Sequence, residues 1–122
     1  METEPIERTT VLICITCREA SGAALADATC SAAADCSDIA VQRIRCLANC
    51  TRGPTAAIRS RNAWTYVFGG LDPARDAEAL IAGARLLAAA SDGLMPWRGR
   101  PEALKRGLIA RVPPLSFSGD LT

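Results

Sequence analysis

The stretch Val11-Leu12-Ile13-Cys14-Ile15-Thr16-Cys17 decides how this chain begins to fold. Its first five residues are apolar and rich in β-branched side chains, which predicts a buried strand over 11–15. Two cysteines, Cys14 and Cys17, fall at the carboxyl end of that strand. The fold and the candidate functional site therefore start in the same segment.

The next segments predict a β-α-β unit. An alanine-rich stretch over 21–35 favours a helix by propensity. Residues 39–45 largely alternate apolar and polar side chains, which predicts a second strand that leads directly into Cys46. This order implies a right-handed parallel crossover, so the carboxyl ends of both strands share one edge of the sheet. Open α/β sheets place their ligands at that edge.

The following segments predict a β-β-α order. Residues 55–59 and 64–68 are typical of an antiparallel hairpin, with Trp64, Tyr66 and Phe68 on one face as core residues. Asp72 and Pro73 predict a helix start, and apolar residues keep the helical period from there to 88.

The predicted organisation has three parts. Residues 1–10 are polar and form a flexible leader, and residues 11–94 form one small α/β domain with a mixed sheet. Residues 95–122 are rich in proline and arginine, which predicts an extended C-terminal arm that holds a short helix over 102–106.

Composition excludes several classes of function. With 122 residues, the chain has the length of one domain. Its 14 basic and 13 acidic residues give a net charge of +1, which disfavours a globally basic nucleic-acid binder. The chain contains no histidine, which excludes Ser-His and Cys-His nucleophile pairs and all histidine-ligated metal sites. Sulfur and carboxylate ligands remain for a metal.

The role of the six cysteines depends on whether the protein lies in a reducing or an oxidising compartment. The N-terminal residues are acidic and lack the basic start and apolar run of a secretory signal, so we expect a cytoplasmic protein. Arg85 interrupts the longest apolar stretch before it reaches the roughly 18 to 20 residues of a membrane span, so no membrane helix is expected. In a reducing compartment, paired cysteines are more often metal ligands or redox groups than disulfides.

Two cysteine pairs, Cys14-x2-Cys17 and Cys46-x3-Cys50, each follow a predicted strand. A parallel arrangement of the strands would bring the four thiols to one end of the sheet, which predicts a metal site. The spacing does not choose between zinc and an iron–sulfur cluster. A thioredoxin-like thiol oxidoreductase that uses Cys14 and Cys17 is a third interpretation. Five arginines between Asp38 and Asp72 would offset an anionic centre: Arg43, Arg45, Arg52, Arg59 and Arg61.

Several motifs carry a family resemblance. They are Val11–Arg18, Cys46–Pro54, Tyr66–Gly69, Asp92–Arg98, Arg100–Glu102 and Ile109–Pro114. Together they resemble a bacterial family of predicted metal-binding proteins of unknown function, over most of residues 11–114. The first part is also similar to thioredoxin-like [2Fe-2S] ferredoxins, which carry two cysteines after the first strand and a C-x3-C pair after the second.

The resemblance implies a thioredoxin-like fold and a [2Fe-2S] cluster on Cys14, Cys17, Cys46 and Cys50. It further implies an electron carrier rather than an enzyme, with a redox partner protein in cobalamin-biosynthesis or metal-handling pathways and a homodimeric state. Neither nucleic acid nor a membrane is an expected partner. A structural or carrier zinc site on the same four cysteines is the alternative.

Cys30 and Cys36 are expected to be small apolar residues of the helix region. However, the spacing Cys17-x12-Cys30 resembles the first spacing of some such ferredoxins. The replacement of one ligand by Cys30 or Cys36 therefore stays open.

Overall fold

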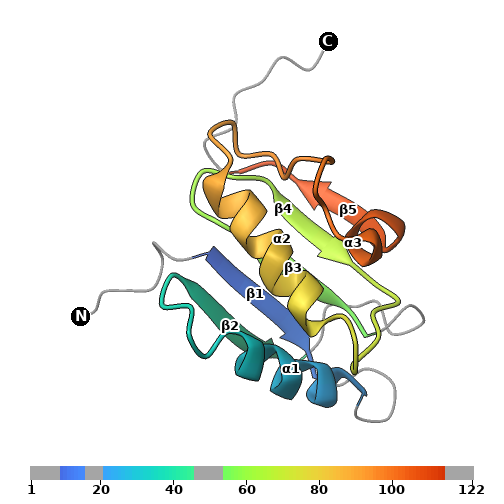
Figure 1. Ribbon diagram of the computed structural model, residues 1–122. Helices are drawn as coiled ribbons and strands as arrows, with labels where there is room; N and C mark the ends of the chain where they lie inside the picture. Colours follow the sequence, from blue (N-terminus) through green and yellow to red (C-terminus); the bar gives the residue numbers. More distant parts are fainter. Residues whose placement is uncertain (1–8, 16–20, 46–53, 115–122) are drawn as a thin grey trace.

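The computed structural model describes residues 9–15, 21–45 and 54–114. In this part the chain forms one five-stranded sheet with the order β2-β1-β3-β4-β5, together with three helices (Figure 1). The strands are β1 (Thr9–Cys14), β2 (Ile39–Ile44), β3 (Ala56–Arg59), β4 (Thr65–Phe68) and β5 (Leu108–Val112). The helices are α1 (Ser21–Ala32), α2 (Ala77–Ala89) and α3 (Glu102–Arg106).

The sheet is mixed, as predicted. β1 and β2 run parallel, with Thr9 opposite Ile39 and Cys14 opposite Ile44. β3 pairs antiparallel with β1, and β4 and β5 continue the antiparallel half. The predicted β-α-β and β-β-α orders are both confirmed, because α1 connects the two parallel strands and α2 follows the β3–β4 hairpin.

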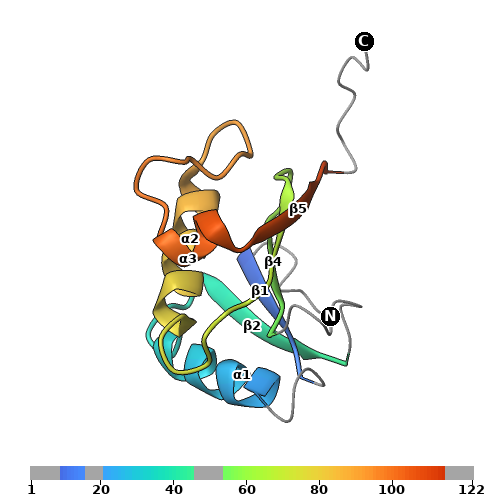
Figure 2. The same ribbon diagram turned by 90° about the vertical axis from the view of Figure 1, so that its right-hand side faces the viewer.

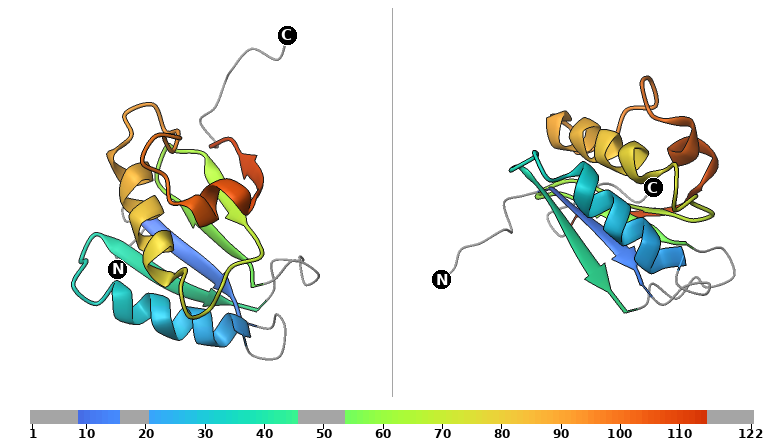
Figure 3. Two further views of the ribbon diagram at one scale, coloured as in Figure 1. Left: turned by 45° about the vertical axis from the view of Figure 1, so that its right-hand side comes forward. Right: turned by 60° about the horizontal axis from the view of Figure 1, so that its bottom comes forward.

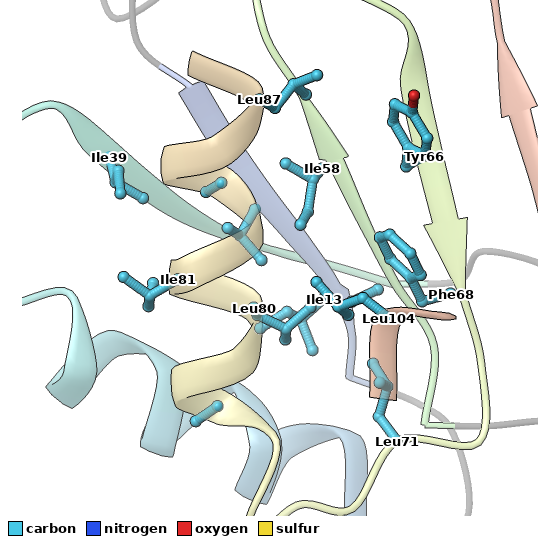
Figure 4. Packing of buried hydrophobic residues seen from close by; sticks show 14 of the residues in the cluster. Ile13, Ile39, Ile58, Tyr66, Phe68, Leu71, Leu80, Ile81, Leu87 and Leu104 are labelled. Carbon is cyan, nitrogen blue, oxygen red and sulfur yellow. The ribbon is translucent and has the colours of Figure 1, made fainter. Parts of the chain in front are cut away.

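The helices pack on one face of the sheet (Figures 2 and 3). α2 crosses the middle of this face, and its Leu80 and Leu87 meet Ile13 and Ile58 of the sheet (Figure 4). Tyr66 and Phe68 of β4 are buried in the same core, as predicted, and Trp64 packs against it. Within the described ranges, none of the helices has the length and apolar character that crossing a membrane requires.

The start of α2 differs from the prediction. The helix begins at Ala77, four residues after Pro73. The Asp72 carboxylate accepts hydrogen bonds from the N–H groups of Ala74 and Arg75, at 2.7 Å and 3.1 Å, and so closes a separate turn. The Asp76 carboxylate in turn accepts one from the Asp72 N–H at 2.7 Å. The two carboxylates thus accept from different backbone donors within this turn, and the helix starts after Asp76.

The ends of the domain also differ from the prediction. The segment predicted as an extended arm adds α3 and β5 to the domain, and β5 pairs with β4 from Leu108 to Val112. Without this strand, β4 would present unpaired N–H and C=O groups at the edge of the sheet. Pairing with β5 gives these groups hydrogen-bond partners. The short helix predicted over 102–106 is confirmed.

At the N-terminal end of the domain, β1 begins at Thr9, within the predicted leader. Residues 1–8 and 115–122 lie outside the described part.

Candidate metal centre

Cys14, the first predicted ligand, is the last residue of β1 and is completely buried. Both neighbouring strands hold the backbone at this point. The Cys14 N–H donates to the Thr55 carbonyl at 3.0 Å, and the Ile15 N–H donates to the Ile44 carbonyl at 2.9 Å. The sheet therefore fixes the backbone from which the Cys14 side chain extends.

The same edge of the sheet brings Cys14 to the segment that carries the second cysteine pair. The parallel register places Ile44 opposite Cys14, and Arg45 follows as the next residue. The Cys14 thiol lies 3.6 Å from the Arg45 carbonyl oxygen. Cys46 is the next residue in the sequence. The predicted approach of the two segments is thus observed up to the residue before Cys46.

Cys17, Cys46 and Cys50 lie outside the described residues, so the geometry of the complete ligand set is not part of this structure. Within the described residues, no group of three or more cysteine, aspartate or glutamate side chains could hold a metal elsewhere. The described part of the chain therefore offers no competing metal site.

The amino terminus of α1 packs directly on the carboxyl ends of β1 and β2, where Cys14 lies; this region is called the Cys14 edge. A Cβ atom added to Gly22 would lie 2.0 Å from the Cys14 carbonyl oxygen, so only glycine permits this approach. The neighbouring Ser21 hydroxyl is buried and has no hydrogen-bond partner in the described part of the chain. A helix amino terminus carries a partial positive charge, and an unused hydroxyl can donate a hydrogen bond. Both features suit an anionic, sulfur-ligated group.

Cys30 and Cys36 lie away from this edge. Because α1 starts at the Cys14 edge, Cys30 lies about 13 Å further along its axis, at 1.5 Å per residue. Cys36 is buried and lies three residues before β2, whose first residue is paired with Thr9 at the opposite end of β1. The observed positions give neither cysteine a contact with Cys14.

Both of these cysteines contact an arginine, which the apolar interpretation did not anticipate. The Arg85 guanidinium of α2 donates to the Cys36 sulfur at 2.6 Å, and this hydrogen bond raises the pKa of Arg85. Arg43 of β2 reaches the Cys30 sulfur at 3.8 Å. Its closer bond, to the Asp27 carboxylate at 2.8 Å, is the main cause that raises the pKa of Arg43. Each arginine–cysteine contact joins segments that are distant in the sequence, so no local sequence pattern predicts it.

A cavity of about 270 Å³ lies between the end of β4 and α3. Its lining combines glycine backbone with one acidic and one basic side chain: Gly69, Gly70, Asp76, Ala103, Arg106 and Gly107. None of these residues is a predicted ligand. The cavity is therefore separate from the candidate metal centre.

Comparison with solved structures identifies the fold. A thioredoxin-like [2Fe-2S] ferredoxin from Aquifex aeolicus superposes with a TM-score of 0.58 and 16% sequence identity, over 91% of this chain and 99% of that one. The wild-type ferredoxin of that description from the same organism, solved at 1.5 Å, gives a TM-score of 0.56 and 14% identity over 85% and 98%. The predicted thioredoxin-like fold is thus confirmed.

Sequence comparison defines the family. No curated protein matches this chain. A family model described as "Protein of unknown function (DUF1636)" matches residues 11–114, which is most of the chain. The chain therefore belongs to the DUF1636 family.

Proposed function

We propose that this protein is an electron carrier that binds a [2Fe-2S] cluster through Cys14, Cys17, Cys46 and Cys50. The observation that carries the proposal is the 3.6 Å approach of the Cys14 thiol to the Arg45 carbonyl, one residue before Cys46. It supports a shared centre between two cysteine pairs that are far apart in the sequence. The fold is shared with thioredoxin-like [2Fe-2S] ferredoxins, which supports a [2Fe-2S] cluster as the bound group.

The donor set fits such a group. The chain has no histidine, so thiolates are its strongest soft ligands, and sulfur ligands are those of [2Fe-2S] clusters. When bound, the cluster supplies one-electron redox chemistry. Thiolates persist in a reducing compartment, so the proposal also assigns the protein to the cytoplasm.

The chain itself contributes positioning and electrostatics. The Thr55 and Ile44 carbonyls accept hydrogen bonds from the Cys14 and Ile15 N–H groups, so the backbone that carries this one ligand is already ordered. The α1 amino terminus and the Ser21 hydroxyl offer positive potential and a hydrogen-bond donor at this edge. Such groups favour the more negative, reduced state and therefore raise the reduction potential.

Burial of Cys14 argues against the thiol-oxidoreductase alternative. A thiol that attacks the disulfide of another protein must be accessible, whereas the exposed fraction of Cys14 is 0%. Zinc on the same four thiolates would use the same edge, and metal analysis separates it from the cluster.

The test is anaerobic purification followed by metal analysis, acid-labile sulfide analysis and visible spectroscopy. We expect a coloured protein that contains iron and sulfide in equal amounts. Cys46→Ser should lose most of the iron and the visible absorbance. Cys36→Ser is the matched control, because it removes a thiol that contacts Arg85 away from the Cys14 edge, and it should retain both.

Three results would contradict the proposal. A colourless protein with stoichiometric zinc would assign the site to zinc. Unchanged iron and sulfide in Cys46→Ser would remove Cys46 from the ligand set. Disulfide reductase activity in a chain that retains Cys14 and Cys17 but lacks Cys46 and Cys50 would establish the thiol chemistry instead.

A further inference from the structure

The charges of this nearly neutral chain are segregated between its parts. The segments that contain α1 and α2, residues 21–38 and 72–94, carry seven acidic and two basic residues. Residues 95–114 carry five basic residues and one acidic residue, Glu102. The turn before α3, α3 itself and β5 thus form a locally basic part of the molecule, which net charge alone conceals.

This basic part presents an exposed tryptophan. Trp97 is 60% exposed and, with Val112, is one of two large apolar side chains exposed in the described residues. Arg100 and Lys105 lie over its ring, 5.1 Å and 5.0 Å from the centroid. Arg98, its neighbour in the sequence, is exposed. In the described part of the chain, no ion pair joins Arg98 or Lys105 to a carboxylate.

Buried hydrogen bonds hold the turn that carries Trp97 in place. Arg100 is buried, donates hydrogen bonds to the carbonyl oxygens of Met95 and Pro96, and also stacks 5.5 Å from the Tyr66 ring centroid. The Met95 N–H donates to the buried Tyr66 hydroxyl at 2.9 Å. A tryptophan fixed in an exposed position loses little conformational entropy on binding, and such residues dominate the binding energy of protein interfaces.

We propose that Trp97, Arg98 and Lys105, named here the Trp97 surface and supported by the buried Arg100, form a docking site for an acidic segment of a partner protein. The partner would place an apolar side chain against the indole and carboxylates against Arg98 and Lys105. The cations carry no acidic partner of their own in the described residues, so charge complementarity selects an acidic occupant. The inference does not depend on the metal centre.

The observations favour a protein over a single-stranded nucleic acid. Stacking of a base needs a free ring face, and two cations of this chain lie over the Trp97 ring, whereas a smaller apolar side chain needs only part of the exposed indole. The acidic segments that contain α1 and α2 would also repel a polyanion that extends beyond the Trp97 surface. A short acidic segment avoids this repulsion.

A phage-displayed library of random linear peptides, selected on the purified full chain, tests this proposal. We expect selected peptides that combine aspartate or glutamate with a large apolar residue. A synthetic peptide of selected sequence should bind Trp97→Ala about 30-fold more weakly than the wild type, as expected for an interface hot spot. Binding should also weaken for Arg98→Glu and Lys105→Glu, and with rising salt concentration.

Two control variants change the charge or the exposed apolar area elsewhere on the molecule. Arg59→Glu reverses an exposed charge on β3, and Val112→Ala removes the other exposed apolar side chain; both should bind as the wild type does. Arg98→Glu alters a solvent-exposed side chain, so it tests the surface even if Trp97→Ala fails to fold. Peptides without acidic residues, affinity that Trp97→Ala and Arg98→Glu leave unchanged, or tighter binding of a single-stranded oligonucleotide would each overturn the proposal.

Discussion

Substitution of Gly22 by alanine tests the contact between α1 and the Cys14 edge. The added Cβ would lie 2.0 Å from the Cys14 carbonyl oxygen, 3.1 Å from its carbonyl carbon and 3.3 Å from the Ile15 Cα. Real Cβ atoms essentially never approach other atoms more closely than 3.0 Å, so the helix and the strand must separate by about 1 Å. All three obstructing atoms belong to backbone, so no side-chain rotation relieves the clash.

The expected cost follows from two opposing effects. Overpacking in a rigid environment costs about 1–3 kcal/mol. Replacing glycine by alanine inside a helix contributes up to about 1 kcal/mol in the other direction. We therefore expect Gly22→Ala to lower the free energy of unfolding by about 1–2 kcal/mol.

Gly83→Ala is the comparison, because Gly83 also lies within a helix, in the middle of α2, where the gain in helix propensity is at least as large as at Gly22 near the start of α1. Its Cβ would meet the Cδ1 atom of Leu104 at 2.3 Å, which is the far end of a flexible side chain rather than backbone. We expect its free energy of unfolding to stay within about 1 kcal/mol of the wild type. Urea denaturation followed by far-ultraviolet circular dichroism, at matched metal content, measures both variants.

The reasoning would be refuted if Gly22→Ala proved as stable as the wild type, or more stable than Gly83→Ala. Either result would mean that α1 can move away from β1 without cost. The Cys14 edge would then not be fixed by the helix, and the preorganisation argued for the candidate metal centre would lose this part of its support.

Three further substitutions or treatments have defined outcomes. Tyr66→Phe deprives the buried Met95 N–H of its acceptor, so the free energy of unfolding in urea should fall by about 1–3 kcal/mol; unchanged stability would mean that this amide finds another acceptor. Arg100→Met removes the donors to the Met95 and Pro96 carbonyls and the contact with the Tyr66 ring, so we expect a loss of about 2–4 kcal/mol and faster proteolysis near Trp97. An unaltered cleavage rate would contradict the role of Arg100. Metal removal by a chelator under reducing conditions should lower the thermal midpoint of the wild type and of Cys36→Ser, because the metal binds the folded state. The same drop in Cys46→Ser would be incompatible with the proposed ligands.

Much of the sheet could be predicted from the sequence because its signals are local. The β-branched run at 11–15 and the alternating residues at 39–45 predict strands, and their order around a helix predicts parallel pairing. The observed β1 and β2 start or end within two residues of these ranges. The Tyr66 and Phe68 core positions follow from the same two-residue period.

Other features depended on contacts that the local pattern of residue types does not specify. Asp72 and Asp76 are both residue types that cap helices, but the Asp72 carboxylate closes a separate turn and α2 begins at Ala77. β5 has a weak strand pattern, and its pairing depends on the open edge of β4. Arg100 stands in a proline- and arginine-rich stretch that suggests a loose arm, yet it is buried.

The sequence by itself determined the chemistry available to this protein: cysteine thiols in two close pairs, no histidine, and strands that lead into each pair. Only the tertiary structure decided which groups meet. The register of β1 and β2 brings the Cys14 thiol to the Arg45 carbonyl, and the helix layer brings Arg85 to Cys36. The physical reason is that residue type and periodicity act over neighbouring residues, whereas register and helix packing depend on the burial and hydrogen bonding of the whole domain.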